Sequence, residues 1–155
     1  MSKRISASNF SPIAIDGPAA SGKTTLGRSL SQIFEIPFLD TGLMYRAITL
    51  LAIREKIPPT ETNACTNLTK TIGIGITNDK WARITISNDD VTKLLHSPEI
   101  ETLVSQYSSI ENVRKYMVGL QREFSDTTPA ILAGRDIGTV VLPDAPIKFF
   151  LDASE

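Results

Sequence analysis

The residues best suited to chemistry form one loop near the start of the chain, Gly17-Pro18-Ala19-Ala20-Ser21-Gly22-Lys23-Thr24. Their spacing fits G-x-x-x-x-G-K-[ST], the phosphate-binding P-loop motif. Its glycines let successive backbone N–H groups point inward, and the following helix adds the positive end of its dipole. We expect Lys23 along the β- and γ-phosphates of a nucleotide and the Thr24 hydroxyl on Mg²⁺. The motif predicts a nucleotide-phosphate site; the alternative is an ordinary strand-to-helix turn that contains Gly and Lys.

The segments on either side of this loop are those that the motif requires. Residues 13–15 are an apolar run typical of a buried strand, and apolar residues recur at helical spacing from Leu26 to Phe34. A strand, a glycine-bounded loop and a helix therefore follow one another. The predicted nucleotide contacts are Gly17, Pro18, Ala19, Ala20, Ser21, Gly22, Lys23, Thr24 and Thr25.

Polar residues follow two other predicted strands, and open α/β sheets build their sites at such strand ends. Asp40 and Thr41 come directly after the strand at 37–39, and Arg46 lies about one turn into the next helix. An arginine offers a planar fork of donors that suits a phosphate. The alternative is a capped helix with a surface arginine.

The third polar cluster is Gly134-Arg135-Asp136-Ile137-Gly138, at the end of the strand at 129–133. Its Arg and Asp are suited to hold one phosphate and one donor-rich base. They could equally be a surface ion pair.

The order of elements predicts an α/β fold. Apolar strands are expected at 13–16, 37–39, 129–133 and 147–151, and helices at 23–34, 43–56, from 98, and from 109 or 110. Four apolar strands separated by helices indicate a parallel sheet with helices on both faces. Between them, 60–70 is polar and weakly helical at best, and 72–77 and 83–87 alternate as a hairpin.

Composition bounds the remaining possibilities. The 155 residues are 41% hydrophobic with a formal net charge of −1, which suits one globular domain and argues against binding along a nucleic-acid chain. No apolar run approaches the ~20 residues of a membrane span. A single cysteine, Cys65, excludes an internal disulfide, and we expect Trp81 to pack the hairpin subdomain rather than to stack on a base.

Four segments in this order resemble bacterial cytidylate kinase: IAIDGPAASGKTT, LDTGLMYRA, SQ with an arginine nine positions after the serine, and AGRDIGTVVLPDAPIKFFLDAS. The resemblance covers 13–155. It implies a P-loop three-layer α/β kinase core at 12–59 and 98–155 and a small inserted antiparallel β subdomain for the nucleoside monophosphate at 60–97. Residues 1–11 are expected to be a flexible leader.

The resemblance also implies transfer of a phosphoryl group from ATP to CMP or dCMP with Mg²⁺, in pyrimidine nucleotide metabolism. Lys23, Arg46 and Arg135 would be catalytic. Asp16 and Asp40, which end the first two predicted strands, are our own candidates to orient water on Mg²⁺. The implied CMP contacts are Thr41, Arg46, Ser105, Arg114, Arg135 and Asp136. An Asp accepting from cytosine N4, with Arg and Ser donating to N3 and O2, matches the pattern that cytosine presents.

Family members continue beyond the position of Glu155 into an arginine-rich lid, so we read the chain as a fragment or a truncation. We expect it to bind CMP, to turn over negligibly and to self-associate through its open sheet edge, whereas the complete protein would be a cytoplasmic monomer. No nucleic acid or membrane partner is expected. The alternatives are a non-catalytic nucleotide-binding fragment and a P-loop kinase with another small acceptor.

Overall fold

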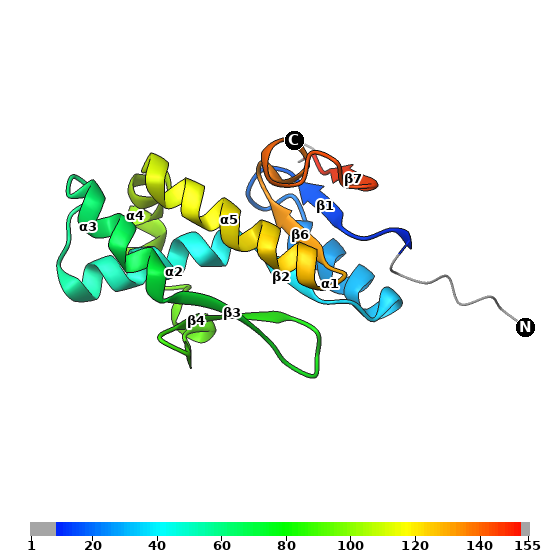
Figure 1. Cartoon of the computed structure of the whole chain (residues 1–155), viewed down its shortest axis with the longest axis horizontal. Helices are drawn as coiled ribbons and strands as arrows, with labels where there is room; N and C mark the ends of the chain where they lie inside the picture. The colour runs from blue at the N-terminus through cyan, green and yellow to red at the C-terminus, as the bar shows by residue number, and fades with distance from the viewer. Residues whose placement is uncertain (1–8, 153–155) are drawn as a thin grey trace, which may run out of the picture. The chain divides into compact units, whose positions relative to one another are not determined.

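The computed structural model describes residues 9–152, and the chain forms two compact units (Figure 1). Residues 1–8 of the predicted leader lie outside the described residues. Of the described residues, unit 1 comprises 9–41, 76–82 and 122–152, and unit 2 comprises 42–75 and 83–121. The predicted domain bounds, with a subdomain at 60–97, follow a different division and stay a prediction.

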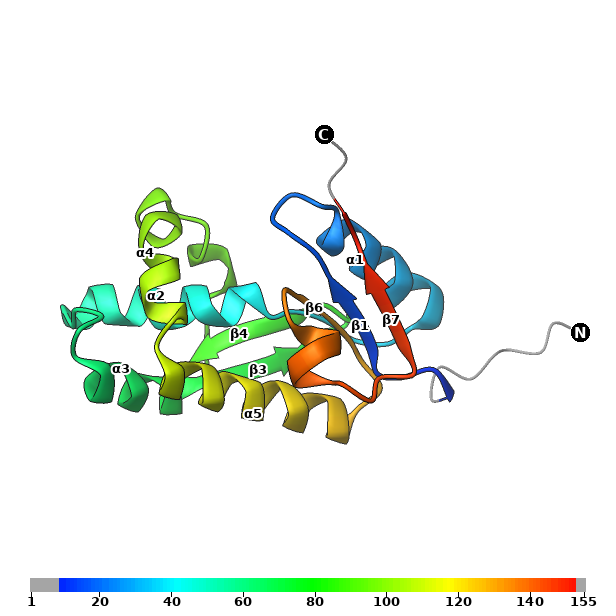
Figure 2. The same ribbon diagram turned by 90° about the horizontal axis from the view of Figure 1, so that it is seen from above.

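Unit 1 is built on a four-stranded sheet in the order β2-β6-β1-β7. The strands are β1 (Ile13–Asp16), β2 (Phe38–Asp40), β6 (Ile131–Gly134) and β7 (Ile147–Phe150). All three neighbouring pairs are parallel, and Figure 2 shows β1 and β7 running side by side. The predicted parallel sheet is confirmed. β7 lies at the sheet edge, where the Phe150 side chain is 73% exposed.

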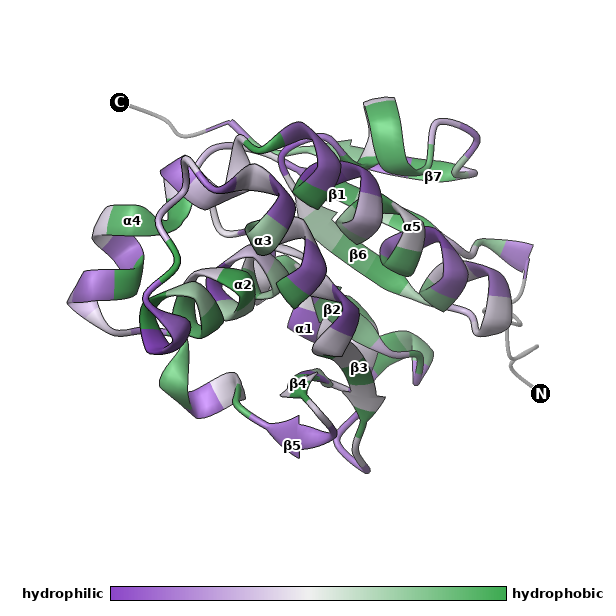
Figure 3. Cartoon of the chain, turned by 60° about the vertical axis from the view of Figure 1, so that its left-hand side comes forward, coloured by the Kyte–Doolittle hydropathy of each residue, from purple (hydrophilic) through white to green (hydrophobic). Residues whose placement is uncertain are grey.

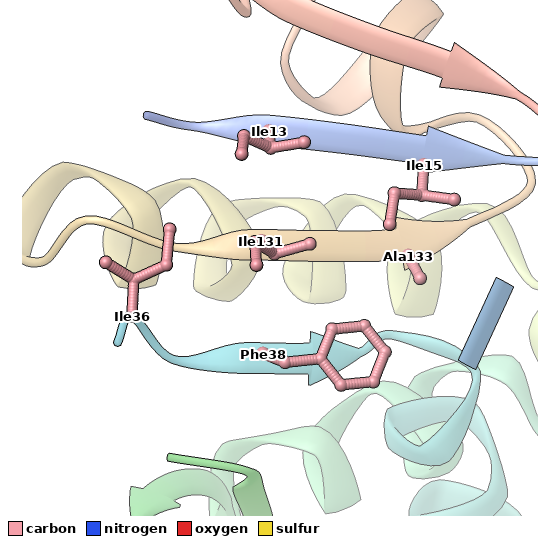
Figure 4. Packing of buried hydrophobic residues seen from close by; sticks show 6 residues of the cluster. All are labelled: Ile13, Ile15, Ile36, Phe38, Ile131 and Ala133. Carbon is pink, nitrogen blue, oxygen red and sulfur yellow. The ribbon is translucent and has the colours of Figure 1, made fainter. Parts of the chain in front are cut away.

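Alternation along these strands builds the core of unit 1. Ile13 and Ile15 of β1 share a buried cluster with Ile131 and Ala133 of β6 and with Phe38 of β2 (Figure 4). Three residues of α1 (Lys23–Phe34) pack against this cluster: Leu26, Leu30 and Phe34. The intervening strand residues Ala14, Leu39 and Leu132 are fully buried as well, so both faces of the sheet are covered along β1, β2 and β6, whereas most of β7 is exposed.

Unit 2 combines helices with the small antiparallel sheet. The helices are α2 (Gly42–Glu55), α3 (Thr62–Leu68), α4 (Pro98–Ser108) and α5 (Glu111–Thr127), the last of which runs on into unit 1 from residue 122. The sheet has the order β3 (Ile72–Ile76), β4 (Ala82–Ile86), β5 (Asp89–Asp90). The predicted start of α4 is confirmed, because the Ser97 Oγ accepts a hydrogen bond of 3.3 Å from the Ile100 N–H.

The structure corrects three expectations about the middle of the chain. The polar stretch expected to be weakly helical contains α3, whose buried face includes Cys65. The hairpin has a third strand, β5, whose two exposed aspartates give no apolar alternation and appear purple in Figure 3. Trp81 packs against the core cluster of unit 1, not as expected within the hairpin subdomain. Its backbone forms an isolated β-bridge with Phe38, and its ring centre lies 4.2 Å from the Arg28 Cζ.

Gly27 provides a test of this packing. A Cβ at this position would lie 2.2 Å from the buried Phe38 ring, so Gly27→Ala should lower the free energy of unfolding by about 1–3 kcal/mol. Gly119 in α5 is the matched control, since a Cβ there meets nothing within 4 Å. Gly119→Ala should raise the free energy of unfolding by about 0.5–1 kcal/mol. Urea denaturation measures both, and a Gly27→Ala protein as stable as the parent would contradict the packing described.

Candidate functional site

The register of the parallel sheet brings three chain segments of unit 1 to one edge. Asp16 at the end of β1 lies opposite Gly134 at the end of β6, and Asp40 at the end of β2 lies opposite Ala133. The P-loop, the segment after β2 and the segment after β6 therefore all leave the sheet at the same level. This edge is formed by the carboxyl ends of the strands, where open α/β sheets bind ligands.

The P-loop backbone needs its glycines at two positions. Gly22 precedes α1 in the left-handed region, with φ 92°. A Cβ at Gly17 would lie only 2.4 Å from the carbonyl oxygen of Leu151, so no side chain fits there. The start of the loop therefore lies in close contact with the residue that follows β7.

One side chain of the loop has a polar atom without a partner. Among the described residues, the Ser21 Oγ is one of the buried side-chain atoms that make no hydrogen bond. A buried hydroxyl without a partner is costly, and an incoming phosphate oxygen would satisfy it. The loop therefore fits an anionic ligand.

Lys23 lies folded over its own loop. Its Nζ donates hydrogen bonds to the carbonyl oxygens of Gly17, at 2.7 Å, and Pro18, at 2.6 Å. Burial lowers the pKa of Lys23; Arg135 acts in the same direction, and Asp40 and Asp16 oppose it. The lysine, both strand-end carboxylates and Arg135 therefore share one electrostatic environment.

Oxygen donors for a magnesium ion lie next to the loop. The Thr24 Oγ1 donates to the Asp40 Oδ2 at 3.4 Å, which puts a hydroxyl and a carboxylate together at the start of α1. Mg²⁺ usually takes one or two protein oxygens and completes its shell with water and substrate phosphates. In the described part of the chain no group of three His, Cys, Asp or Glu residues could hold a metal. The Thr24 and Asp40 oxygens therefore fit an Mg²⁺ ion that is bound together with nucleotide phosphates.

Asp16, the other predicted carboxylate, is engaged by the main chain. Its Oδ1 accepts from the Ile137 N–H and its Oδ2 from the Gly138 N–H, both at 2.7 Å. The side chain is buried, with 7% exposure for the residue. The sequence did not indicate this contact, because 121 and 122 positions separate the partners.

Each of the two glycines in the cluster after β6 lets a polar side chain approach the backbone closely. A Cβ at Gly134 would lie 2.5 Å from the Thr41 Oγ1, and one at Gly138 would lie 3.2 Å from the Asp16 Oδ2. The Thr41 hydroxyl is buried and donates to the carbonyl oxygen of Ala133 at 2.8 Å. Arg135 is exposed and Asp136 half-buried.

The other predicted CMP contacts lie in unit 2. The Arg46 Nη1 donates to the carbonyl oxygen of Leu95 at 3.1 Å. The Arg114 guanidinium lies 5.6 Å from the centre of the Tyr45 ring, and its Nη1 donates to the Ser108 carbonyl at 3.4 Å. Ser105 is exposed on α4. Arg114 thus lies beside Tyr45, the residue that directly precedes Arg46.

Sequence reasoning missed one element of this edge. Directly after Asp136 the chain forms a single π-type turn, η4 (Ile137–Val141). Arg122 of α5 donates from Nε to the Val141 carbonyl and from Nη2 to the Val140 carbonyl, both at 2.9 Å. Neither the turn nor its arginine has a local sequence signal.

Lys23→Met tests the anion site. Removing the ammonium while keeping the chain length should weaken binding of inorganic triphosphate by about 2–3 kcal/mol, as for a charge-assisted contact. Lys115→Met is the control, because Lys115 is 70% exposed on α5, where it pairs with Glu111. Calorimetric titration measures both, and equal affinities of the two variants would contradict the assignment of Lys23.

Comparison with known proteins agrees with this geometry. The family model described as cytidylate kinase matches residues 13–155. The cytidylate kinase of Clostridium tetani is 39% identical over 142 residues, and that of Carboxydothermus hydrogenoformans is 41% identical over 143. Each alignment covers 92% of this chain, which spans only 62% and 64% of these two relatives.

A further relative carries the same match within a larger protein. The bifunctional pantoate ligase/cytidylate kinase of a Synechococcus strain is 42% identical over 146 residues, which is 27% of its length. No described helix of our chain is long and apolar enough to cross a membrane. With a matching family model over 13–155 and a P-loop at the strand ends, the chain belongs to the cytidylate kinase family.

Proposed function

We propose that the protein transfers a phosphoryl group from ATP to CMP or dCMP, giving ADP and CDP or dCDP. The observation that carries this proposal is the shared edge of unit 1, where the P-loop, Asp40 and Arg135 meet. Family membership supports the reaction type. The names of the relatives support cytidylate as the acceptor.

The donor nucleotide would be held by the P-loop. Its phosphates would replace the Gly17 and Pro18 carbonyls as partners of the Lys23 ammonium and would satisfy the Ser21 hydroxyl. Thr24 would hold Mg²⁺ directly and Asp40 through water, and the bound ion would neutralise phosphate charge.

The acceptor would be bound by six side chains: Thr41, Arg46, Ser105, Arg114, Arg135 and Asp136. Arg46 and Arg135 would hold its phosphate, because arginine is the side chain best shaped for phosphate oxygens. Asp136 would accept from cytosine N4, and Ser105 and Arg114 would donate to N3 and O2.

Positioning and charge stabilisation would account for catalysis. Phosphoryl transfer needs little covalent chemistry from a protein, and a phosphate acceptor needs no dedicated base. Lys23, Arg46 and Arg135 would be the catalytic residues, each meeting charge on the transferring group or the acceptor. The cytoplasmic location, the monomeric state of the complete protein and self-association of this chain stay predictions.

Calorimetric titration with CMP, UMP and AMP, each with and without ATP and Mg²⁺, tests the proposal. We expect CMP to bind at least about tenfold more tightly than UMP, because a mismatched base leaves buried polar groups unpaired. Absence of CMP binding, or equal binding of all three, would overturn it. Preference for another acceptor would identify a P-loop kinase of different specificity.

Asp136→Asn tests the base-reading role directly. Asparagine can donate as well as accept, so it can meet the O4 of uracil, and the ratio of UMP to CMP dissociation constants should fall about tenfold. Asp126→Asn near the end of α5 is the charge-matched control, because Asp126 is an exposed aspartate of the same unit. An unchanged ratio in the Asp136 variant would show that Asp136 does not read the base.

A further inference from the structure

We infer that Asp16 is a positioning residue that fixes the acceptor-binding segment against the P-loop. The inference rests on the proposed function, since it concerns the segment that carries Arg135 and Asp136. Both carboxylate oxygens of Asp16 accept main-chain N–H groups at 2.7 Å. Such charge-assisted bonds are shorter and stronger than neutral ones, and here they are buried.

The first of these bonds orients the peptide that follows Asp136. This peptide joins the Asp136 carbonyl to the Ile137 N–H, and the N–H donates to Asp16. At its other end, the Asp136 carbonyl accepts from Val140 N at 2.9 Å and from Val141 N at 3.1 Å. A peptide plane that is bonded at both ends cannot rotate freely, so the backbone that carries the Asp136 side chain has one orientation.

The far end of the same turn is bonded to a second charged side chain. The Arg122 guanidinium donates to the Val140 and Val141 carbonyls, whose own amides bond back to Asp136. η4 therefore lies between a carboxylate at its start and a guanidinium at its end. Two elements that are distant in sequence, β1 and α5, thus both form hydrogen bonds with this five-residue turn.

This arrangement ties acceptor binding to the P-loop through one residue. Asp16 directly precedes Gly17, and its side chain reaches the amides after Asp136. A loss of this contact should loosen Asp136 and Arg135 without removing any group that would touch CMP. The expected signature is weaker CMP binding in the absence of Mg²⁺, which a role for Asp16 in orienting metal-bound water does not produce.

Asp16→Asn is the decisive variant. Its amide nitrogen cannot accept an N–H, so one of the two bonds is lost while size is kept. Titrated with CMP in EDTA and without ATP, the variant should bind about tenfold more weakly than the parent, the cost of one charge-assisted hydrogen bond. Its affinity for inorganic triphosphate should not fall, whereas a general loss of structure would weaken both. Asp144→Asn, an exposed aspartate just after η4, is the charge-matched control.

Arg122→Met gives an independent arm should Asp16→Asn fail to fold. It removes the donors at the other end of η4 and should also weaken CMP binding with triphosphate binding retained. Amide hydrogen exchange at Ile137 and Gly138 should become faster in both variants. If the parent binds CMP and the variants bind it equally well, the positioning role is wrong and the proposed function stands. If the parent binds no CMP, the proposed function fails, and the inference fails with it.

Discussion

The structure of unit 1 depends on the register of β6 between β1 and β2. With Asp16 opposite Gly134 and Asp40 opposite Ala133, three loops begin at one level of the sheet. A shift by one residue would turn the side chains of β6 to the opposite faces and move the Gly134–Gly138 segment away from the P-loop. The buried cluster of Ile13, Ile15, Ile131 and Ala133 opposes such a shift, because it needs these residues on one face. Core packing and site geometry are therefore set by the same pairing.

Charge balance at this edge follows from that register. Burial disfavours the charged form of Lys23, the two strand-end carboxylates favour it, and Arg135 disfavours it. The ammonium donates hydrogen bonds to the Gly17 and Pro18 carbonyl oxygens, which are neutral dipoles. A phosphate offers this ammonium a charged partner. The same polyanion would also be attracted by the exposed Arg135.

The sequence predicted the parts of this arrangement that have local signals. The P-loop follows a fixed spacing, the buried strands are apolar runs, and the start of α4 has a serine cap followed by proline. It did not predict α3, because Thr62–Leu68 is short and polar and its buried side rests largely on Cys65. The two-residue strand β5 is too short for a periodicity to be seen.

Contacts between distant residues were beyond prediction for a different reason. Asp16 was expected to orient water on a metal because it ends a strand beside a P-loop. Its hydrogen-bond partners in the structure, Ile137 and Gly138, lie 121 and 122 positions later in the sequence. Arg122 and Trp81 are similar cases: each is placed by a tertiary contact that no spacing encodes. The roles of Arg46, Ser105 and Arg114 came from family resemblance, and ligand binding remains their test.

If the proposed function holds, nucleotides bind at the carboxyl ends of β1, β2 and β6. Two-dimensional amide NMR spectra of the chain, recorded during separate additions of ATP with Mg²⁺ and of CMP alone, test it most directly. We expect ATP to shift most the amides of Gly17 and of residues 19–24, and CMP to shift most those of 134–138. Shifts confined to regions away from these strand ends, such as the amides of α3, would contradict it.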